Sequence, residues 1–491
     1  MLRTALLILC CSAGLHAATC ESLAGLTLAD AKVTLAKPVG AGEFTPPTGS
    51  AAAYQKLPAF CRVSVTLTPS KDSDIKVEVW LPLTGWNGKY LAVGNGGWAG
   101  SISYSALAAG VQRGYATSST DTGHAGGGGS FALGHPEKLI DYAWRSEHEM
   151  LLKAKLLLAE FYGKGAQYSY WNGCSAGGKQ GLKEAQRFPE DFDGIVAGAP
   201  AANWTGRSTQ SMWIAQAVRA PGATLGAAEF ALVHRAVMDA CDAKDGVKDG
   251  VLENPRACTF DPVALGCKGD VKEGCLSGPQ VEAVRKIYSA VKDNDGGVVF
   301  AGHERGSELG WNTMAGARPF AIGLDHFRYV VFKDAMWDYS GISFPKDADL
   351  ATRTDAGLIN ALSTDLKAFI GHGGKLLQYH GWNDPQISPG SSVDYFESVR
   401  RVMGDVAKSY RLFMAPGMAH CGGGEGPNQF DMLGALEQWV EQKKAPESVL
   451  ASRVQEGKTV RTRPLCPYPQ VAMYRGSGST EDAANFVCKA E

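Results

Sequence analysis

Residues 167–189, "QYSYWNGCSAGGKQGLKEAQRFP", restrict the fold more than any other stretch of this chain. An apolar and aromatic run typical of a strand leads into a glycine-rich turn, and a segment typical of a helix follows. Within the turn, Gly173 to Gly177 read G-C-S-A-G and fit the pattern G-x-S-x-G. A serine in a sharp turn between a strand and a helix is the arrangement of a nucleophile elbow. The pattern therefore predicts Ser175 as a nucleophile, and a plain glycine turn is the alternative interpretation.

Strand-like and helix-like segments alternate on both sides of this turn. We expect strands within 61–69, 75–83, 89–97, 167–173 and 193–200, helices within 146–163 and 179–189, and further α/β segments within 356–384, 410–421 and 430–443. Such alternation is typical of a mostly parallel sheet with helices on both faces. The sequence therefore predicts the α/β class.

The alternation stops between Trp204 and Asp349, where loops, aromatic residues and cysteines predominate. A chain of 491 residues is longer than a usual single core, so an insertion into one α/β core explains the pattern economically. We expect a signal peptide at 1–18, core at 19–203, an inserted lid at 204–350 and core again at 351–491. Long insertions beside a glycine turn often act as lids.

The first residues have the layout of a secretory signal peptide. One early positive charge precedes an apolar run at 5–11, and small residues follow at Ala17 and Ala18; a buried N-terminal helix is the alternative. Cleavage would remove Cys10 and Cys11, two of the 12 cysteines, and leave an even number for an oxidising compartment. We therefore expect a secreted or periplasmic protein. No later segment is apolar for the ~18 residues that a membrane span requires, and the net charge of −2 gives no reason to expect nucleic acid as a partner.

A serine elbow needs a base and an orienting acid, which follow in the order Ser, Asp, His. "LLQYHGWNDP" places Asp384 just beyond an apolar strand, and "FMAPGMAHC" does the same for His420. In this interpretation Ser175 attacks, His420 relays the proton, and Asp384 fixes the imidazole tautomer. The other histidines that compete for the role of base are His380, His372, His303, His135 and His124.

Two cysteines adjoin the proposed nucleophile and base. Cys174 precedes Ser175, and Cys421 follows His420. A bridge between the cysteines would hold serine and histidine within hydrogen-bond reach, where small displacements are costly for catalysis. It would also prevent the cysteine from acting as a nucleophile. The alternative, a cysteine hydrolase, requires a free Cys174.

"GCSAGG", "HGWNDP" and "PGMAHC" resemble the Cys-Ser, Asp and His-Cys motifs of the tannase and feruloyl esterase family, which includes the hydrolase of mono(2-hydroxyethyl) terephthalate. The resemblance extends from about Cys20 to Cys488. It implies an α/β-hydrolase core with a large inserted lid domain, carboxylic ester hydrolysis and no organic cofactor. It also implies the disulfides Cys174–Cys421, Cys20–Cys61, Cys241–Cys258, Cys267–Cys275 and Cys466–Cys488.

An oxyanion hole needs two backbone N–H groups that face the developing negative charge. One is expected from Ala176, the residue after the nucleophile, and the other from the loop "GNGGWAG". By similarity to the family we favour Gly97, and Gly96 is the neighbouring possibility.

The segment "CDAKDGVKDGVLENPRAC" carries three aspartates separated by glycines. Carboxylates and main-chain oxygens are the ligands that calcium prefers, although solvated Asp-Gly turns would give the same pattern. The family resemblance implies a structural Ca²⁺ in the lid, held by the carboxylates of Asp242, Asp245 and Asp249 and the main-chain oxygens of Val247 and Val251.

These features favour an exported serine esterase that acts on small aromatic esters, first of the feruloyl type. Galloyl esters and the terephthalate half-ester are the nearest alternatives, and a catalytically inactive binding module and a serine peptidase are more remote ones. Aromatic residues of the insertion that could line an acyl pocket are Trp204, Trp311, Phe320, Phe327, Tyr329, Trp337 and Phe344. Arg318 and Arg328 could bind an acid group of the substrate, or could be solvated surface residues.

Overall fold

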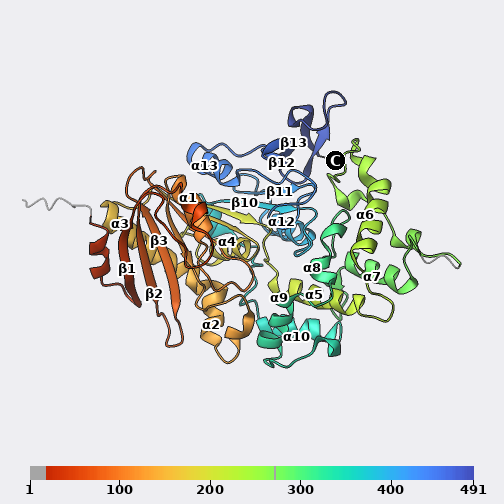
Figure 1. Ribbon diagram of the computed structural model, residues 1–491, viewed down its shortest axis with the longest axis horizontal. Helices are drawn as coiled ribbons and strands as arrows, with labels where there is room; N and C mark the ends of the chain where they lie inside the picture. Colours follow the sequence, from red (N-terminus) through yellow and green to blue (C-terminus); the bar gives the residue numbers. More distant parts are fainter. Residues whose placement is uncertain (1–17, 270–272, 491) are drawn as a thin grey trace, which may run out of the picture.

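The core of the protein is a nine-stranded sheet with the strand order β1-β2-β3-β5-β4-β6-β7-β10-β11 in the computed structural model, which describes residues 18–269 and 273–490 (Figure 1). β1, β2, β3 and β5 pair antiparallel, and the pairs from β5 through β4, β6, β7 and β10 to β11 are parallel. The bounds are β1 Ala31–Val39, β2 Phe60–Leu67, β3 Ile75–Pro82, β4 Lys89–Val93, β5 Ala116–Thr120, β6 Tyr168–Cys174, β7 Gly194–Gly198, β10 Lys375–Gly381 and β11 Tyr410–Ala415.

Helices cover both faces of this sheet. Successive residues of a strand point to opposite faces, so Trp171 and Ile195 pack in one hydrophobic cluster with α3, α4 and α12, whereas Tyr170 and Val196 pack in another with α1 and α13. The helix bounds are α1 Tyr104–Gln112, α3 Ser146–Tyr162, α4 Ala176–Arg187, α12 Gly390–Met403 and α13 Met432–Gln442. The prediction of a mostly parallel sheet between two helical layers is confirmed.

Strand β5 lies in the middle of the sheet but has no apolar pattern. Its residues Thr117, Ser118, Ser119 and Thr120 are fully buried hydroxyl side chains. They are tolerated because they find partners: Ser118 Oγ lies 2.6 Å from the hydroxyl of Tyr90. Hydropathy patterns do not detect a strand of this kind, so the apolar pattern predicts no strand at 116–120.

Between β7 and β10 the chain leaves the sheet and forms the right-hand side of the molecule in Figure 1. The sequence predicts that loops predominate there and that the α/β alternation stops, and the regular elements of the segment are indeed mostly helices rather than alternating strands and helices. Its elements are α5 Trp204–Val218, α6 Ala227–Cys241, α7 Gly278–Tyr288, β8 Val291–Lys292, β9 Val298–Phe300, α8 Asn312–Ala315, α9 Ala321–Asp325, α10 Lys346–Asp355 and α11 Lys367–Gly371. Helix α5 is buried around nearly its whole circumference, so it lacks the one-sided apolar pattern that marks a surface helix.

The remaining elements are short. They are α2 Pro136–Ile140 and the C-terminal hairpins β12 Val449–Gln455 with β13 Lys458–Leu465 and β14 Gln470–Tyr474 with β15 Phe486–Ala490. Single helical turns are η1 Glu21–Gly25, η2 Ala51–Tyr54, η3 Gly129–Ala132, η4 Asp141–Arg145, η5 Asp242–Asp245, η6 Pro255–Ala257, η7 Pro262–Leu265, η8 Glu308–Gly310, η9 His326–Val331, η10 Tyr339–Gly341 and η11 Ala483–Asn485.

The signal peptide expected at 1–18 lies outside the described residues, apart from Ala18. Across residues 18–269 and 273–490, no helix has both the length and the apolar character needed to span a bilayer.

Candidate active site

Ser175 occupies the sharp turn between β6 and α4. Its backbone has φ 65° and ψ −122°, a conformation that residues other than glycine rarely adopt. The turn is held by a hydrogen bond of 2.9 Å from Ser175 N to Gly198 O. A Cβ on Gly173 would lie 2.5 Å from the carbonyl oxygen of Gly177, so only glycine fits there. The strained serine is the elbow geometry that the motif predicts.

A disulfide joins this turn to the segment after β11. Cys174 and Cys421 are bonded, and their Cα atoms lie 6.1 Å apart although 247 positions separate them in the sequence. Because the carboxyl ends of parallel strands meet at one edge of a sheet, the bridge brings the neighbours of both cysteines to that edge. It rules out a free thiol at Cys174 and places Ser175 and His420 next to bonded residues.

His420 is hydrogen-bonded to a buried carboxylate. Its Nδ1 lies 2.6 Å from Oδ2 of Asp384, whose side chain is fully buried. An ionised carboxylate only accepts, so Nδ1 carries the hydrogen and Nε2 is left as the proton acceptor. The other carboxylate oxygen of Asp384 accepts from the main-chain N–H groups of Gln386, at 2.8 Å, and Ile387, at 3.0 Å. This pair has the geometry of a base and its orienting acid.

A second histidine reaches the same carboxylate. His380 Nε2 lies 3.0 Å from Asp384 Oδ2 and 3.1 Å from the carbonyl oxygen of Ile387. Both partners are acceptors, so Nε2 carries a hydrogen; Nδ1 lies 2.7 Å from Ser392 Oγ. Burial alone would raise the pKa of Asp384, but the charge of His420 and the hydrogen bonds from His380 and His420 hold that pKa below its ordinary value. His380, one of the competing bases, is thus a partner of the acid.

The other competing histidines have different partners. His124 Nε2 lies 2.7 Å from the carbonyl oxygen of Trp98, and the exposed His135 pairs with Asp72. His372 is exposed on the surface and His303 is buried. Among the histidines that the structure describes, only His420 and His380 donate hydrogen bonds to the Asp384 carboxylate.

Ala176 is the first residue of α4, so its N–H has no acceptor within the helix. The loop after β4 lies against this helix start: Gly177 N donates to Asn95 O at 2.8 Å, and a Cβ on Gly94 would lie 2.5 Å from Gly177 Cα. The loop that carries Gly97 is therefore fixed beside the nucleophile turn. An oxyanion hole requires two backbone N–H groups that point at one oxygen position, and the proximity of this loop to Ala176 is a precondition for that.

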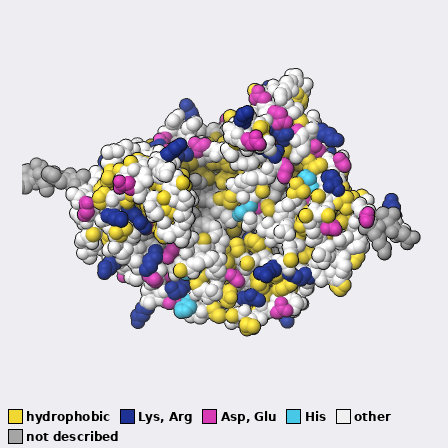
Figure 2. All heavy atoms as spheres, in the orientation of Figure 1, with side chains coloured by type: hydrophobic (Ala, Val, Ile, Leu, Met, Phe, Trp, Pro, Cys, Tyr) yellow, Lys and Arg dark blue, Asp and Glu magenta, His cyan; other side chains and the backbone are white. Residues whose placement is uncertain are grey.

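Gly97 has φ +57°, a conformation that favours glycine. Helix α9 of the insertion lies directly on it, since a Cβ at Gly97 would be 2.9 Å from Ile322 Cδ1. The indole Nε1 of Trp98 donates to the carbonyl oxygen of Ile322 at 3.0 Å. The insertion thus contacts the loop beside the proposed site. Figure 2 shows a hollow near the middle of the molecule, bordered by hydrophobic side chains and with histidine atoms beside it.

Of the seven aromatic candidates, Trp204 is the one that packs with residues of the site. It is 1% exposed and shares a hydrophobic cluster with Ala176, Ile387, Trp98 and Tyr142. Five of the other candidates belong to hydrophobic clusters of the insertion or pack against them: Trp311, Phe320, Phe327, Trp337 and Phe344. Tyr329 is half-buried.

The two predicted acid-binding arginines have other environments. Arg318 is exposed, and Arg328 donates through Nε to the carbonyl oxygen of Trp337 at 3.0 Å. Arg207 is buried instead, with Nε 3.2 Å from Gln386 O and no hydrogen-bond partner for Nη1 among the described residues. Burial lowers the pKa of Arg207 to about 10. The sequence does not mark Arg207 as a site residue. The available signal for its proximity to the site is its position one helical turn after Trp204.

The aspartate-rich segment forms a compact loop. Asp242 accepts hydrogen bonds from Gly250 N at 3.0 Å, Asp245 accepts from Val247 N at 3.0 Å, and Asp249 is paired with Arg463. Burial, then the charges of Asp249 and Asp242, raise the pKa of Asp245 to about 6.

Besides burial, the charges of Asp249 and Asp242 raise the pKa of Asp245, so the three carboxylates are neighbours. Their oxygens are not all within 4.8 Å of one another. In the described part of the chain, one group of three His, Cys, Asp or Glu side chains has its ligand atoms all within 4.8 Å of one another, and it lies elsewhere, at His148, Glu184 and Asp191.

The remaining disulfides are the pairs that the resemblance implies: Cys20–Cys61, Cys241–Cys258, Cys267–Cys275 and Cys466–Cys488.

A strained serine between strand and helix, joined by a disulfide to the segment that carries a histidine–carboxylate pair, is the arrangement of an α/β hydrolase. The family model described as tannase and feruloyl esterase matches residues 61–489, so this chain belongs to the tannase and feruloyl esterase family.

Individual relatives agree with this assignment. An uncharacterized esterase of Xanthomonas campestris is 36% identical over 96% of this chain and 91% of its own length. A probable feruloyl esterase B-1 of Aspergillus oryzae is 35% identical over 88% of this chain and 84% of its own. The crystal structure of feruloyl esterase B from Aspergillus oryzae superposes with a TM-score of 0.91 at 33% identity, covering 96% of this chain and 99% of that chain. The protein is a carboxylic ester hydrolase.

Proposed function

We propose that Ser175, His420 and Asp384 form a catalytic triad that hydrolyses aromatic carboxylic esters, first of the feruloyl type. The observation that carries this proposal is the 2.6 Å bond between His420 Nδ1 and Asp384 Oδ2, because it leaves Nε2 as the base. The feruloyl esterases among the relatives support a feruloyl-type acyl group in the substrate. The buried ring of Trp204, which packs in one cluster with Ala176, supports an aromatic acyl group.

The reaction follows from these groups in two steps. Ser175 Oγ attacks the ester carbonyl carbon while His420 Nε2 takes the hydroxyl proton, and the carbonyl oxygen becomes an oxyanion held by the N–H groups of Ala176 and Gly97. When the tetrahedral intermediate collapses, His420 returns the proton to the leaving alkoxide and the alcohol departs. Water then attacks the acyl-serine, loses its proton to His420, and the acid is released as Ser175 recovers its hydrogen.

A second candidate substrate is an ester whose acyl group carries a free acid, such as the terephthalate half-ester. The observation that favours it is Arg207, which lies one turn beyond Trp204 and whose Nη1 has no hydrogen-bond partner in the described part of the chain. A guanidinium binds a carboxylate with two parallel hydrogen bonds. Galloyl esters remain the third substrate of this class to compare.

The test is to measure kcat/KM for methyl ferulate, methyl gallate and the terephthalate half-ester side by side. Methyl ferulate should be hydrolysed best, and Ser175→Ala should abolish turnover of all three. An Arg207→Met variant should lower kcat/KM for the half-ester selectively. Turnover by Ser175→Ala at the wild-type rate would reject the proposal, and hydrolysis of the matching amides would favour a peptidase.

We also propose that the protein is exported to the periplasm or the medium. The composition of residues 1–18 and the five disulfides support this location, because disulfides persist in oxidising compartments. N-terminal sequencing of the mature protein should find a start near residue 19. An intact Met1 in the mature protein would contradict the proposal.

For the aspartate loop we propose a structural Ca²⁺ held by Asp242, Asp245 and Asp249 with the main-chain oxygens of Val247 and Val251. The oxygen donors suit this cation, and the arginines that form ion pairs with the loop, Arg463 and Arg461, both contact Asp249. Bound calcium would neutralise the loop and hold it closed. Removal of calcium with a chelator should lower the Tm, and Asp245→Asn should remove that response.

A further inference from the structure

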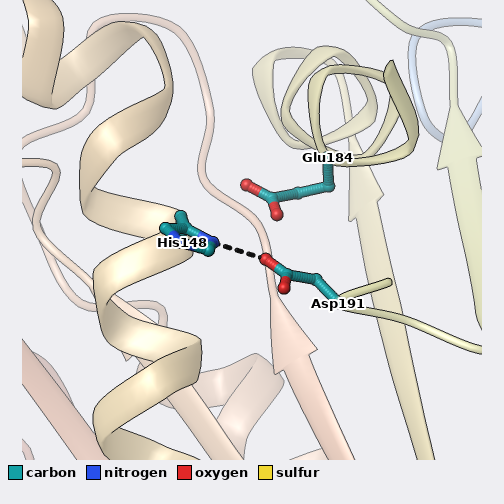
Figure 3. A group of neighbouring side chains, drawn as sticks. All are labelled: His148, Glu184 and Asp191. Atoms are coloured by element: carbon teal, nitrogen blue, oxygen red, sulfur yellow. Dashed lines mark hydrogen bonds and ion pairs between the residues drawn. The ribbon is translucent and has the colours of Figure 1, made fainter. Parts of the chain in front are cut away.

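Three side chains that could bind a metal converge on the side of α4 that faces α3. His148 comes from α3, Glu184 from α4 and Asp191 from the loop before β7, and their ligand atoms all lie within 4.8 Å of one another (Figure 3). His148 Nδ1 lies 2.6 Å from Asp191 Oδ2. Figure 3 shows the carboxylate of Glu184 directed toward this pair.

Glu184 is the unusual member of this group. It is 1% exposed, and neither of its carboxylate oxygens accepts a hydrogen bond from any described residue. An ionised carboxylate without donors is strongly disfavoured in a protein interior, so buried charges are normally paired or coordinate a metal. Glu184 therefore needs either a proton or a cation.

The other two side chains are already held in position. The ring of His148 stacks on Phe188 with centroids 3.7 Å apart and planes inclined by 9°. Lys155 donates to the main-chain oxygen of Asp191 at 2.8 Å and does not hydrogen-bond the carboxylates. His148 and Asp191 keep 22% and 12% of their side-chain surface exposed, so an ion can enter from solvent.

We propose that His148, Glu184 and Asp191 form a binding site for a divalent transition-metal cation of the Zn²⁺ class. One imidazole nitrogen and two carboxylate oxygens are a ligand set that Zn²⁺ accepts, with water in the fourth position. The cation would replace the hydrogen bond between His148 and Asp191 and would give Glu184 its missing partner. Because it lies away from the aspartate loop, this site is distinct from the proposed calcium site.

The position of the group indicates a structural role. Glu184 lies nine residues after Ser175 on α4, which corresponds to roughly 13 Å along the helix axis. The ion would tie α3, α4 and the start of β7 together without touching the ester. We therefore expect Zn²⁺ to change stability and to leave kcat unchanged.

The competing occupant is a proton. Burial, followed by the charges of Asp191 and Glu147, raises the pKa of Glu184 well above its ordinary value, so a neutral carboxyl group could donate to Asp191. A shared proton predicts no affinity for metal, and the two accounts can be separated directly.

The experiment titrates Zn²⁺ into Ca²⁺-saturated, otherwise metal-free protein by calorimetry, and follows Co²⁺ by its visible absorption. We expect one Zn²⁺ per chain, a higher Tm with Zn²⁺, and Co²⁺ bands characteristic of nitrogen ligation. Glu184→Gln and His148→Gln should each weaken binding at least tenfold. The matched control is His135→Gln, which removes the histidine of the exposed pair with Asp72 and should leave binding unchanged.

Absence of Zn²⁺ binding to the wild type, or equal binding by the wild type and both variants, would overturn the proposal in favour of the shared proton. Should either variant fail to fold, the wild-type Co²⁺ spectrum decides, because a spectrum with only the weak bands of hexaaqua Co²⁺ contradicts ligation by His148, Glu184 and Asp191. Ester hydrolysis is not a readout here, so failure of this site leaves the catalytic proposal unaffected.

Discussion

Two buried carboxylates in the core, Asp384 and Glu184, have opposite environments. Asp384 lies in the turn after β10 and accepts hydrogen bonds from His420, His380 and two main-chain N–H groups. Glu184 lies in the last turns of α4 and accepts none from the described residues. Burial pushes the pKa of both groups upward, and only Asp384 ends below its ordinary value. Donors, and not depth in the protein, decide whether a buried acid keeps its charge.

We propose that this difference corresponds to different roles, catalytic for Asp384 and structural for Glu184. An ionised Asp384 can fix the tautomer of His420 and stabilise its cation during turnover. Burial raises the pKa of Glu184 and so favours its neutral form unless a cation binds, and a neutral acid cannot perform that task.

Asp384→Asn should lower kcat by about 10⁴, because the amide can donate to Nδ1 and so favours the wrong imidazole tautomer. Steady-state hydrolysis of methyl ferulate measures the effect. Glu184→Gln is the matched acid-to-amide control and should stay within about twofold of the wild type. Comparable losses in the two variants would contradict the distinction between these carboxylates.

The double variant Cys174→Ser/Cys421→Ser should lower kcat by about 10², because the turn that carries Ser175 is no longer tied to the turn that carries His420. The control is Cys267→Ser/Cys275→Ser, which opens a bridge inside the insertion. Kinetics with methyl ferulate at low temperature separate this effect from unfolding. A larger loss in the control pair would show that the catalytic bridge has no special role.

The same two pairs should differ in stability. The loop-entropy estimate gives an upper figure of about 5.5 kcal/mol for a bridge that spans 247 positions and about 2.5 kcal/mol for one that spans 8. Urea unfolding of both double variants checks the order.

His380→Leu should lower kcat by roughly tenfold and move the acid limb of kcat/KM to higher pH by about one unit. Loss of a donor makes the Asp384 carboxylate more basic, which favours the protonated, inactive form of His420. The measurement is the pH profile for methyl ferulate. His380→Gln can restore a donor and should bring the limb back toward the wild type. A lower kcat with no shift in the acid limb of the pH profile would mean that His380 contributes packing alone and does not tune the Asp384 carboxylate.

Glu184→Gln should change the pH dependence of stability in metal-free protein. The folded-state pKa of Glu184 is raised, so the wild type loses stability as pH rises above the unfolded-state pKa of about 4.3, until the folded-state pKa is reached. The difference in unfolding free energy between wild type and variant should grow by up to about 1.4 kcal/mol per pH unit in that window. Urea unfolding in EDTA at several pH values measures it, and a constant difference would contradict the raised pKa.

Much of the fold could be predicted because it depends on local patterns. Apolar runs and small residues predict the strand, the glycine turn and the helix around Ser175, and similar local patterns predict β7, β10 and α13. Strand β5 could not be found this way, since its buried hydroxyl groups depend on partners such as Tyr90 from another strand. Helix α5 was missed because it is buried on all sides.

The site divides in the same way. Ser175, Asp384 and His420 follow strands that the sequence marks, so their convergence at one edge of the sheet could be expected. The placement of His380 behind the acid could not, because it depends on the turn that returns Ile387 to the imidazole. Arg207 and Glu184 are buried by residues distant in sequence, which a local pattern does not predict; the one local signal was the position of Arg207 a helical turn after Trp204.

The central claim is that Ser175 carries the acyl group, and covalent labelling tests it most directly. The protein is treated with diethyl p-nitrophenyl phosphate, which phosphorylates activated serines, and its intact mass and peptides are then measured. Our account predicts one added diethylphosphoryl group per chain, located on Ser175, with loss of ester hydrolysis in proportion to labelling. A label on another residue, or full hydrolytic activity in fully labelled protein, would contradict it.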